Sequence, residues 1–240
     1  MARAAFLPSS LSGPAASNVN YLGAARCRRR FELFYPDGFE DETYLVAERS
    51  GKERARLEWE AELAAPQYRK LLARGEFRQI ADIAVRIESR TSMLFSFEKM
   101  ALRDALKTPA GARLFATELY AFLYGHGSPQ RRFGDWIEAL ADLPQRRSPV
   151  LTWPVATVFG FIARPDRHIF FKPRVTRKAA QAYGYDLAYQ SRPAWAGYQS
   201  LLTFAAVIRR DLARKPGFKA KDMIDLQSFL WVLGAPEYDA

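Results

Sequence analysis

Apolar residues recur at helical spacing through most of this 240-residue chain, so its core has to be buried between helices. The segment 76–89 is the clearest case, because its apolar side chains repeat every three or four residues. One face of that helix carries Phe77, Ile80, Ile83, Ala84 and Ile87. The segment 91–106 repeats the pattern, which predicts a second helix with one buried face. That face is expected to carry Leu94, Phe97, Ala101, Leu102 and Ala105.

Proline and glycine stand where these helices should begin and end. Pro66 suits the first turn of a helix that Gly75 ends. Thr108 is suited to cap a helix that has Pro109 at its first position and ends at Gly125. The chain therefore reads as one helix after another.

The fold class that follows is all-α, a compact multi-helix bundle. Only residues 168–172 alternate like a strand, and a single short segment cannot build a sheet. Hydrophobic residues make up 49% of the chain, which is enough for a packed core. We expect a single helical domain over residues 31–240, with a soft internal boundary near 125–128. Residues 1–30 contain no Asp or Glu and are expected to form a flexible N-terminal extension.

The net charge of +10 favours a polyanionic partner, DNA more than RNA. The longest apolar run, 150–163, is too short for a membrane span, so we expect no membrane association. One cysteine, Cys27, cannot form an internal disulfide, and this suits a reducing, cytoplasmic setting.

Common catalytic and cofactor motifs are missing. The sequence "SGKE" contains Gly51-Lys52 but lacks the glycine spacing and the Ser/Thr of a phosphate-binding loop. Two histidines, His126 and His168, are too few for most metal sites or catalytic triads. We therefore expect neither a metal nor a cofactor.

The segment Arg164–Ala180, here called the basic elbow, carries six Lys/Arg against one acid, Asp166. Pro165 favours a turn, and Pro173 lies just before a helix that begins near Val175. Cations at a helix N-terminus, where backbone N–H groups are free, can bind a phosphate together with those groups. A solvated cationic turn is the alternative. The predicted phosphate contacts are Arg164, Arg167, Lys172, Arg174, Arg177 and Lys178, and the predicted nucleic-acid-binding residues also include His168 and Arg192.

Three acids are the weak candidates for catalysis. Asp222 and Asp225 lie three residues apart at the start of a helix, where they could share a face and form a paired-acid site. The stronger interpretation is helix capping, because acids in the first turn satisfy free N–H groups. Glu98 is the third candidate, and an ion pair on a solvated face is the alternative for it.

Several segments resemble known protein families. "LTWPVATVFGFIARPDRHIFFKPRVTRKAAQAYG", "SRPAWAGYQSLLTFAAVIRRDL" and "KDMIDLQSFLWVLG" look like a bacterial family without an established activity, and the resemblance runs from about Arg30 onward. More distantly, their order is similar to helical modules of McrB-like restriction proteins and to the helix-hairpin-helix DNA glycosylase scaffold in the C-terminal half.

The glycosylase resemblance covers Leu151, Thr157 and the segment 175–180. The hairpin glycines of that scaffold are absent, since residues 152–155 read Thr-Trp-Pro-Val. The loop that would hold the catalytic Asp reads Phe-Lys-Pro-Arg over 171–174. The resemblance thus implies a scaffold and nucleic-acid contact rather than glycosylase chemistry.

The favoured hypothesis is a non-catalytic nucleic-acid-binding protein, or an accessory subunit of a bacterial DNA-processing or defence assembly. One alternative is a nuclease or glycosylase-like enzyme that uses the acids. The other is a purely protein-binding subunit, which an exposed apolar patch on the "QSFLWVLG" helix would support.

Overall fold

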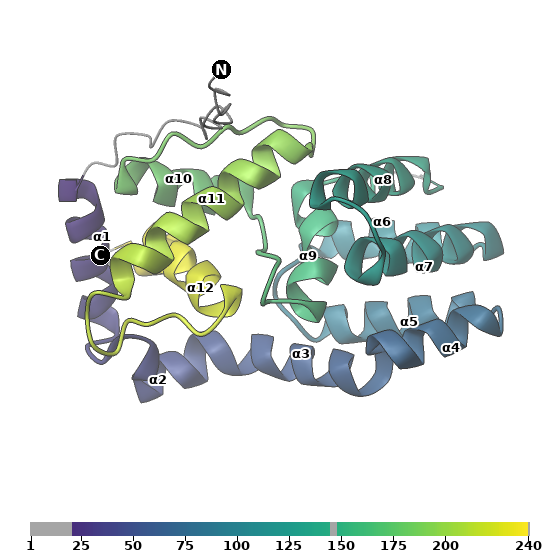
Figure 1. Cartoon of the computed structure of the whole chain (residues 1–240), viewed down its shortest axis with the longest axis horizontal. Helices are drawn as coiled ribbons and strands as arrows, with labels where there is room; N and C mark the ends of the chain where they lie inside the picture. The colour runs from purple at the N-terminus through teal and green to yellow at the C-terminus, as the bar shows by residue number, and fades with distance from the viewer. Residues whose placement is uncertain (1–20, 145–147, 240) are drawn as a thin grey trace, which may run out of the picture.

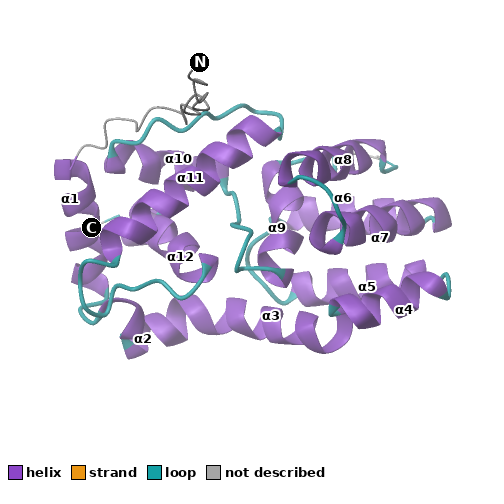
Figure 2. Cartoon of the chain, in the orientation of Figure 1, coloured by secondary structure: helices purple, strands orange, loops and turns teal. Residues whose placement is uncertain are grey.

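The computed structural model describes residues 21–144 and 148–239, and over these residues the protein is all-α with no strand. The long helices are α1 (Tyr21–Phe34), α3 (Ser50–Leu63), α4 (Ala65–Ala73), α5 (Phe77–Ser89), α6 (Ser96–Leu106), α7 (Pro109–Tyr124), α8 (Pro129–Asp142), α9 (Trp153–Ala163), α10 (Pro173–Tyr183), α11 (Trp195–Leu212) and α12 (Met223–Gly234). Short turns of helix are η1 (Gly38–Glu40), α2 (Glu42–Tyr44), the π-helix η2 (Leu45–Arg49) and η3 (Pro236–Tyr238). The predicted all-α class is confirmed (Figure 2).

The helices gather in two groups that α3 joins along one edge (Figure 1). One group contains α1, α10, α11 and α12, so segments from both ends of the sequence lie side by side. The other contains α4 to α9. Helix α9 is buried along nearly its whole length and packs on α3, α5, α7 and α8. We call these groups the terminal lobe and the central lobe.

The predicted capping signals are used as such. Thr108 accepts a hydrogen bond from the Gly111 N–H at the start of α7, and Ser128 accepts one from the Arg131 N–H at the start of α8. Pro109 occupies the first turn of α7, where its missing N–H costs nothing. These local signals explain why the helix starts could be predicted.

Each lobe contains a dense cluster of aromatic side chains. In the terminal lobe, the centroid of the Phe31 ring lies 5.2 Å from that of Phe229 and 5.9 Å from that of Tyr44. In the central lobe, Phe115 lies 5.2 Å from Phe159 in an edge-to-face arrangement. Both clusters belong to one hydrophobic core that runs through the two lobes.

The N-terminal prediction is corrected over residues 21–30. Residues 1–20 of the expected extension lie outside the described residues, but residues 21–30 belong to α1. Cys27 on this helix is buried, and burial raises the pKa of its thiol to about 11. Gly23 lies so close to the Tyr183 carbonyl that a Cβ would approach its oxygen to 2.7 Å, so α1 packs tightly on α10.

The predicted helix over 91–106 is also partly wrong. Helix α6 begins only at Ser96, after a bend that holds the buried Leu94. Phe97, expected on the buried face, is 54% exposed and stacks on Phe95 with ring centroids 5.7 Å apart. The apolar spacing predicts one continuous helix, but residues 91–95 are not helical, so the helical spacing does not extend across them. The point 125–128 is simply the connection between α7 and α8, which pack against each other.

The strand-like segment of the elbow is extended, yet it pairs with no strand in the described part of the chain. Side chains satisfy its backbone instead, because the Ile169 N–H donates to the Tyr198 hydroxyl and the Phe171 N–H donates to Thr157 Oγ1. Ile169 and Phe171 are fully buried. The segment 168–172 of the elbow thus passes between the two lobes and is buried there (Figure 1).

Candidate anion-binding site

The basic elbow separates into three parts with different exposure. The turn at 164–167 is on the surface, the segment 168–172 is buried, and the first turns of α10 present an exposed face. The predicted phosphate contacts are therefore not one continuous group.

Both arginines of the turn, Arg164 and Arg167, contact the single acid Asp166. Arg164 donates from Nε and Nη2 to the two carboxylate oxygens of Asp166 at 3.1 and 3.0 Å. Arg167 Nε lies 3.3 Å from the same carboxylate. Burial would raise the pKa of Asp166, but the two guanidinium groups lower it below its usual value. One carboxylate thus faces two cations, and the turn has an excess of positive charge.

A third arginine, Arg132 of α8, joins them. Its Nη1 donates to the Phe122 carbonyl at 3.0 Å, while its Nε is buried and has no hydrogen-bond partner among the described residues. Burial lowers the pKa of Arg132, and the charges of Arg167 and Arg164 lower it further. The positive charges of Arg164 and Arg167 thus act on Arg132. We call Arg132, Arg164 and Arg167 the arginine cluster.

An aromatic pocket of about 320 Å³ opens beside the cluster. Its walls combine arginines with rings from α7, α8, α11 and the elbow: Phe122, Phe133, His168, Trp195 and Tyr198, with Pro129 and Leu202 at the edge. Phe133 and Tyr198 are stacked with centroids 4.5 Å apart, so the inner wall is rigid. Arg132 and Arg167 line the same pocket, which puts positive charge beside an apolar cavity.

His168, predicted to bind nucleic acid, lies inside the protein rather than on its surface. The side chain is 8% exposed, and its Nδ1 lies 3.2 Å from the Tyr198 hydroxyl. Burial lowers the pKa of His168 to about 3, and the nearby arginines act in the same direction. At neutral pH the imidazole is uncharged and adds no positive charge to the surface.

Lys172 is corrected in the same way. It is buried, its ammonium donates to the Met93 carbonyl at 2.9 Å, and it lies 3.3 Å above the centre of the Phe95 ring. Burial lowers the pKa of Lys172, an effect that Glu98 and Glu88 oppose. The side chain ties the elbow to the central lobe rather than facing a ligand.

The remaining predicted cations lie on the exposed face of α10 and in the loop after it. Arg174 and Arg192 are exposed and form no ion pair with a described residue. Arg177 lies over the Tyr189 ring, with 4.6 Å between its Cζ and the ring centroid. Lys178 is partly neutralised, because Asp239 accepts hydrogen bonds from its ammonium at 2.7 and 2.6 Å.

Asp222 and Asp225 serve structure at the start of α12. Asp222 caps the helix by accepting from the Ile224 N–H, and it receives two hydrogen bonds from Arg49 at 3.1 and 2.8 Å. Asp225 is fully buried and accepts from Arg49, the Tyr44 hydroxyl and the Lys221 N–H. Arg49 ends the π-helix, which turns its side chain toward α12. The expected capping role of Asp222 is confirmed.

Of the three weakly predicted acids, only Asp222 lines a cavity beside the elbow. That open cavity of about 690 Å³ also contacts Arg164 and Asp166. Glu98 lies elsewhere, at the start of α6, where it accepts from the Phe95 N–H and the Thr152 hydroxyl. Asp222 and Asp225 therefore both bind Arg49, whereas Glu98 has other partners, so the three acids form no shared site. Within residues 21–144 and 148–239, no three His, Cys, Asp or Glu side chains are placed to hold a metal ion.

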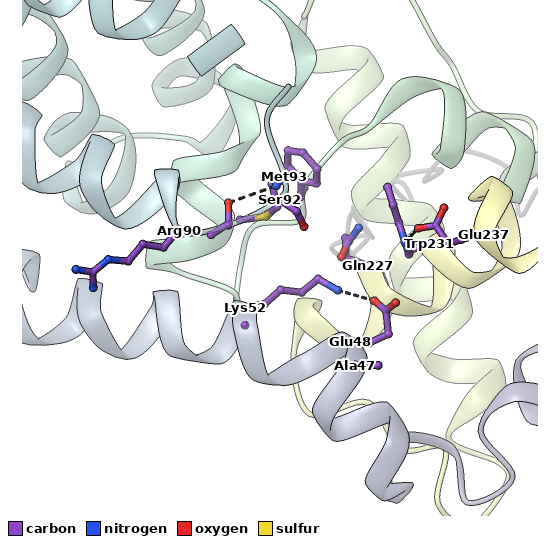
Figure 3. A pocket seen from close by; sticks show the side chains of 12 residues that line it. Ala47, Glu48, Lys52, Arg90, Ser92, Met93, Gln227, Trp231 and Glu237 are labelled. Atoms are coloured by element: carbon purple, nitrogen blue, oxygen red, sulfur yellow. Dashed lines mark hydrogen bonds and ion pairs between the residues drawn. The ribbon is translucent and has the colours of Figure 1, made fainter. Parts of the chain in front are cut away.

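A further cavity of about 380 Å³ lies between the lobes (Figure 3). Lys52 Nζ donates to Glu48 at 2.8 Å and to Ser228 at 2.9 Å, and burial lowers the pKa of Lys52 while Glu48 opposes that effect. Gln227 also lines this cavity, and its Oε1 is buried with no partner among the described residues. Two bases, Lys52 and Arg90, and two acids, Glu48 and Glu237, line the cavity, so it adds no net positive charge to the basic surface.

Sequence reasoning missed Arg132 and the ring wall of the aromatic pocket. Arg132 lies more than 30 residues before the elbow, and its "QRRFGDW" segment reads as an ordinary amphipathic helix. The only available signal was a basic pair at the start of that helix, which also fits a solvated face. No known family model, curated protein or solved structure matches this chain.

Proposed function

We propose that this protein binds the phosphate backbone of nucleic acid, DNA in the first place, without catalysing a reaction. The observation that carries the proposal is the arginine cluster. Arg132, Arg164 and Arg167 come from α8 and the elbow turn, and only Asp166 is ion-paired with any of them among the described residues. A phosphate bound here would be attracted by three positive charges that the single acid Asp166 only partly balances.

Two further features support a polyanion over a small anion. The first turns of α10 add two exposed cations, Arg174 and Arg177. The net charge of +10 steers a polyanion toward the protein at low salt. We place the protein in the cytoplasm, as an accessory subunit of a DNA-processing or defence assembly.

The enzyme alternative gains little from the site. Every oxygen of Asp225 and Asp222 already accepts hydrogen bonds from Arg49, Tyr44 or backbone N–H groups. A carboxylate that acts as a general base or binds a metal needs a free lone pair directed at the reacting atoms.

The protein-binding alternative required an exposed apolar patch on the "QSFLWVLG" helix, which is part of α12. Nearly all of α12 is buried, including Phe229, Leu230 and Leu233. Exposed apolar side chains gather instead on and before α6, at Phe95 and Phe97. These two rings form a small patch rather than a helix-wide surface.

A pair of double variants tests the proposal. Arg164→Gln/Arg167→Gln removes two cations of the cluster, and Arg69→Gln/Lys70→Gln removes two exposed cations of α4 as a control of equal charge. Affinity for a labelled duplex of about 20 base pairs is measured by fluorescence anisotropy from about 50 to about 300 mM salt. The cluster variant should bind at least about tenfold more weakly, and its slope of log affinity against log salt should fall by about 2.

The control variant should keep most of the affinity, because neither Arg69 nor Lys70 lines the two cavities that the cluster borders. Equal losses in the two double variants would mean that only net charge matters, and the proposed site would be wrong. The variant Arg174→Gln/Arg177→Gln reports separately whether the α10 face contacts the same duplex.

A further inference from the structure

The aromatic pocket beside the arginine cluster has the composition of a site for a flat, uncharged ring. Its volume of about 320 Å³ lies at the lower end of the range for ligand sites. Phe133 and Tyr198 form a stacked inner wall, and Trp195 stands partly exposed at the start of α11. Trp195 lies 6.0 Å from Phe133, centroid to centroid, so it extends the aromatic wall toward solvent.

Two nitrogen atoms of residues that line this pocket have no hydrogen-bond partner among the described residues. The His168 side chain is more than nine-tenths buried, and only its Nδ1 has a hydrogen-bond partner among the described residues. Whichever ring nitrogen carries the proton, Nε2 offers one hydrogen-bonding group. Arg132 Nε is a buried donor without a described partner. A ligand with a polar edge can pair with His168 Nε2, while Arg132 contributes its positive charge to the pocket.

Charge is distributed unevenly across the pocket. The imidazole is neutral at physiological pH, while the guanidinium groups of Arg132 and Arg167 are positive. A matching ligand carries a neutral ring with polar edges joined to a negative group. A nucleotide unit within a strand has this combination.

We propose that the pocket receives one unpaired base of a single-stranded nucleic acid, whose adjoining phosphate is bound by Arg132 and Arg167. This inference rests on the proposed function and narrows it, since a base inside a duplex is stacked and paired and cannot enter. Trp195 supplies the stacking surface, and His168 contacts the edge of the base.

The experiment compares two strands of equal charge by anisotropy. One is a strand of about twelve thymidine nucleotides, and the other has the same phosphates but no bases. Stacking on an aromatic side chain is worth about five- to hundredfold in affinity, so the native protein should prefer the first strand by that factor. Trp195→Ala should lose most of this preference and leave binding of the abasic strand unchanged. Trp195→Phe should retain part of it.

Phe97→Ala is the matched control, because it removes an exposed ring outside the pocket. It should leave the preference intact. Thermal unfolding of each variant shows whether it is folded, and Trp195→Phe keeps the test valid if the alanine variant unfolds.

Each outcome has one meaning. Equal affinity of the native protein for both strands, or a preference that survives in Trp195→Ala, overturns the base pocket while leaving phosphate binding intact. Thymidine monophosphate that competes as strongly as the strand also overturns it, because the pocket would then serve a free nucleotide. Failure to bind either strand or the duplex would refute the proposed function itself.

Discussion

Buried, neutral His168 makes the stability of this protein depend on pH in a defined window. The pKa of His168 is about 3 in the folded protein and about 6.5 in an unfolded chain. The unfolded state therefore binds a proton between these values, while the folded state does not. The stabilisation is complete above about pH 6.5 and is lost progressively as the pH falls toward 3.

The magnitude follows from the two pKa values. Between about pH 8 and pH 5 this single group should lower the free energy of unfolding by about 2 kcal/mol. Arg132, Arg164 and Arg167 favour the neutral imidazole, and Asp166 opposes them. Because the side chain is 8% exposed, solvent screens these contributions little.

Urea unfolding at the two pH values measures this quantity, and His168→Gln supplies the reference. The variant has no group that titrates in this window at that position. The native protein should lose about 2 kcal/mol more than the variant between pH 8 and pH 5. Equal losses would refute the burial of a neutral imidazole, since all other titrating groups are common to both proteins.

Three other side chains give predictions of their own. Arg49→Met should lower the free energy of unfolding by about 3–5 kcal/mol in urea titrations, because it leaves the fully buried Asp225 without its cationic partner. Lys172→Met should cost about 1–3 kcal/mol by removing the hydrogen bond to Met93, yet leave DNA affinity unchanged in anisotropy; weaker binding would show that Lys172 contacts the ligand after all. Cys27, with its raised pKa, should react with a disulfide reagent only after unfolding, and rapid labelling of the native protein would contradict its burial.

The sequence allowed the helices to be predicted because their signals are local. Thr108 and Pro109 stand at the start of α7 and Gly125 at its end, and each affects only the nearest turn of the helix. The capping role of Asp222 was predictable for the same reason. Such signals depend on neighbours in sequence, which a reader of the sequence can see.

The candidate site was only partly predictable because it depends on distant partners. Lys172 appears as one more cation of a basic run, yet its partner is a carbonyl 79 residues earlier in the chain. His168 is buried because Tyr198 and the aromatic wall cover it. Arg132 joins the cluster only through the packing of α8 beside the elbow. Tertiary contacts of this kind leave no periodic pattern in the sequence.

The place of α1 has a consequence for how the chain folds during synthesis. Phe31 packs on Phe229, whose codon is translated about 200 residues later. At common rates of translation, α1 therefore waits about 10–40 s for its partner. The helices of the central lobe follow one another closely in the chain and can pack during that time (Figure 1). Helix α1 leaves the ribosome before the other described helices and is thus among the last of them to be buried, and until then its apolar face stays exposed.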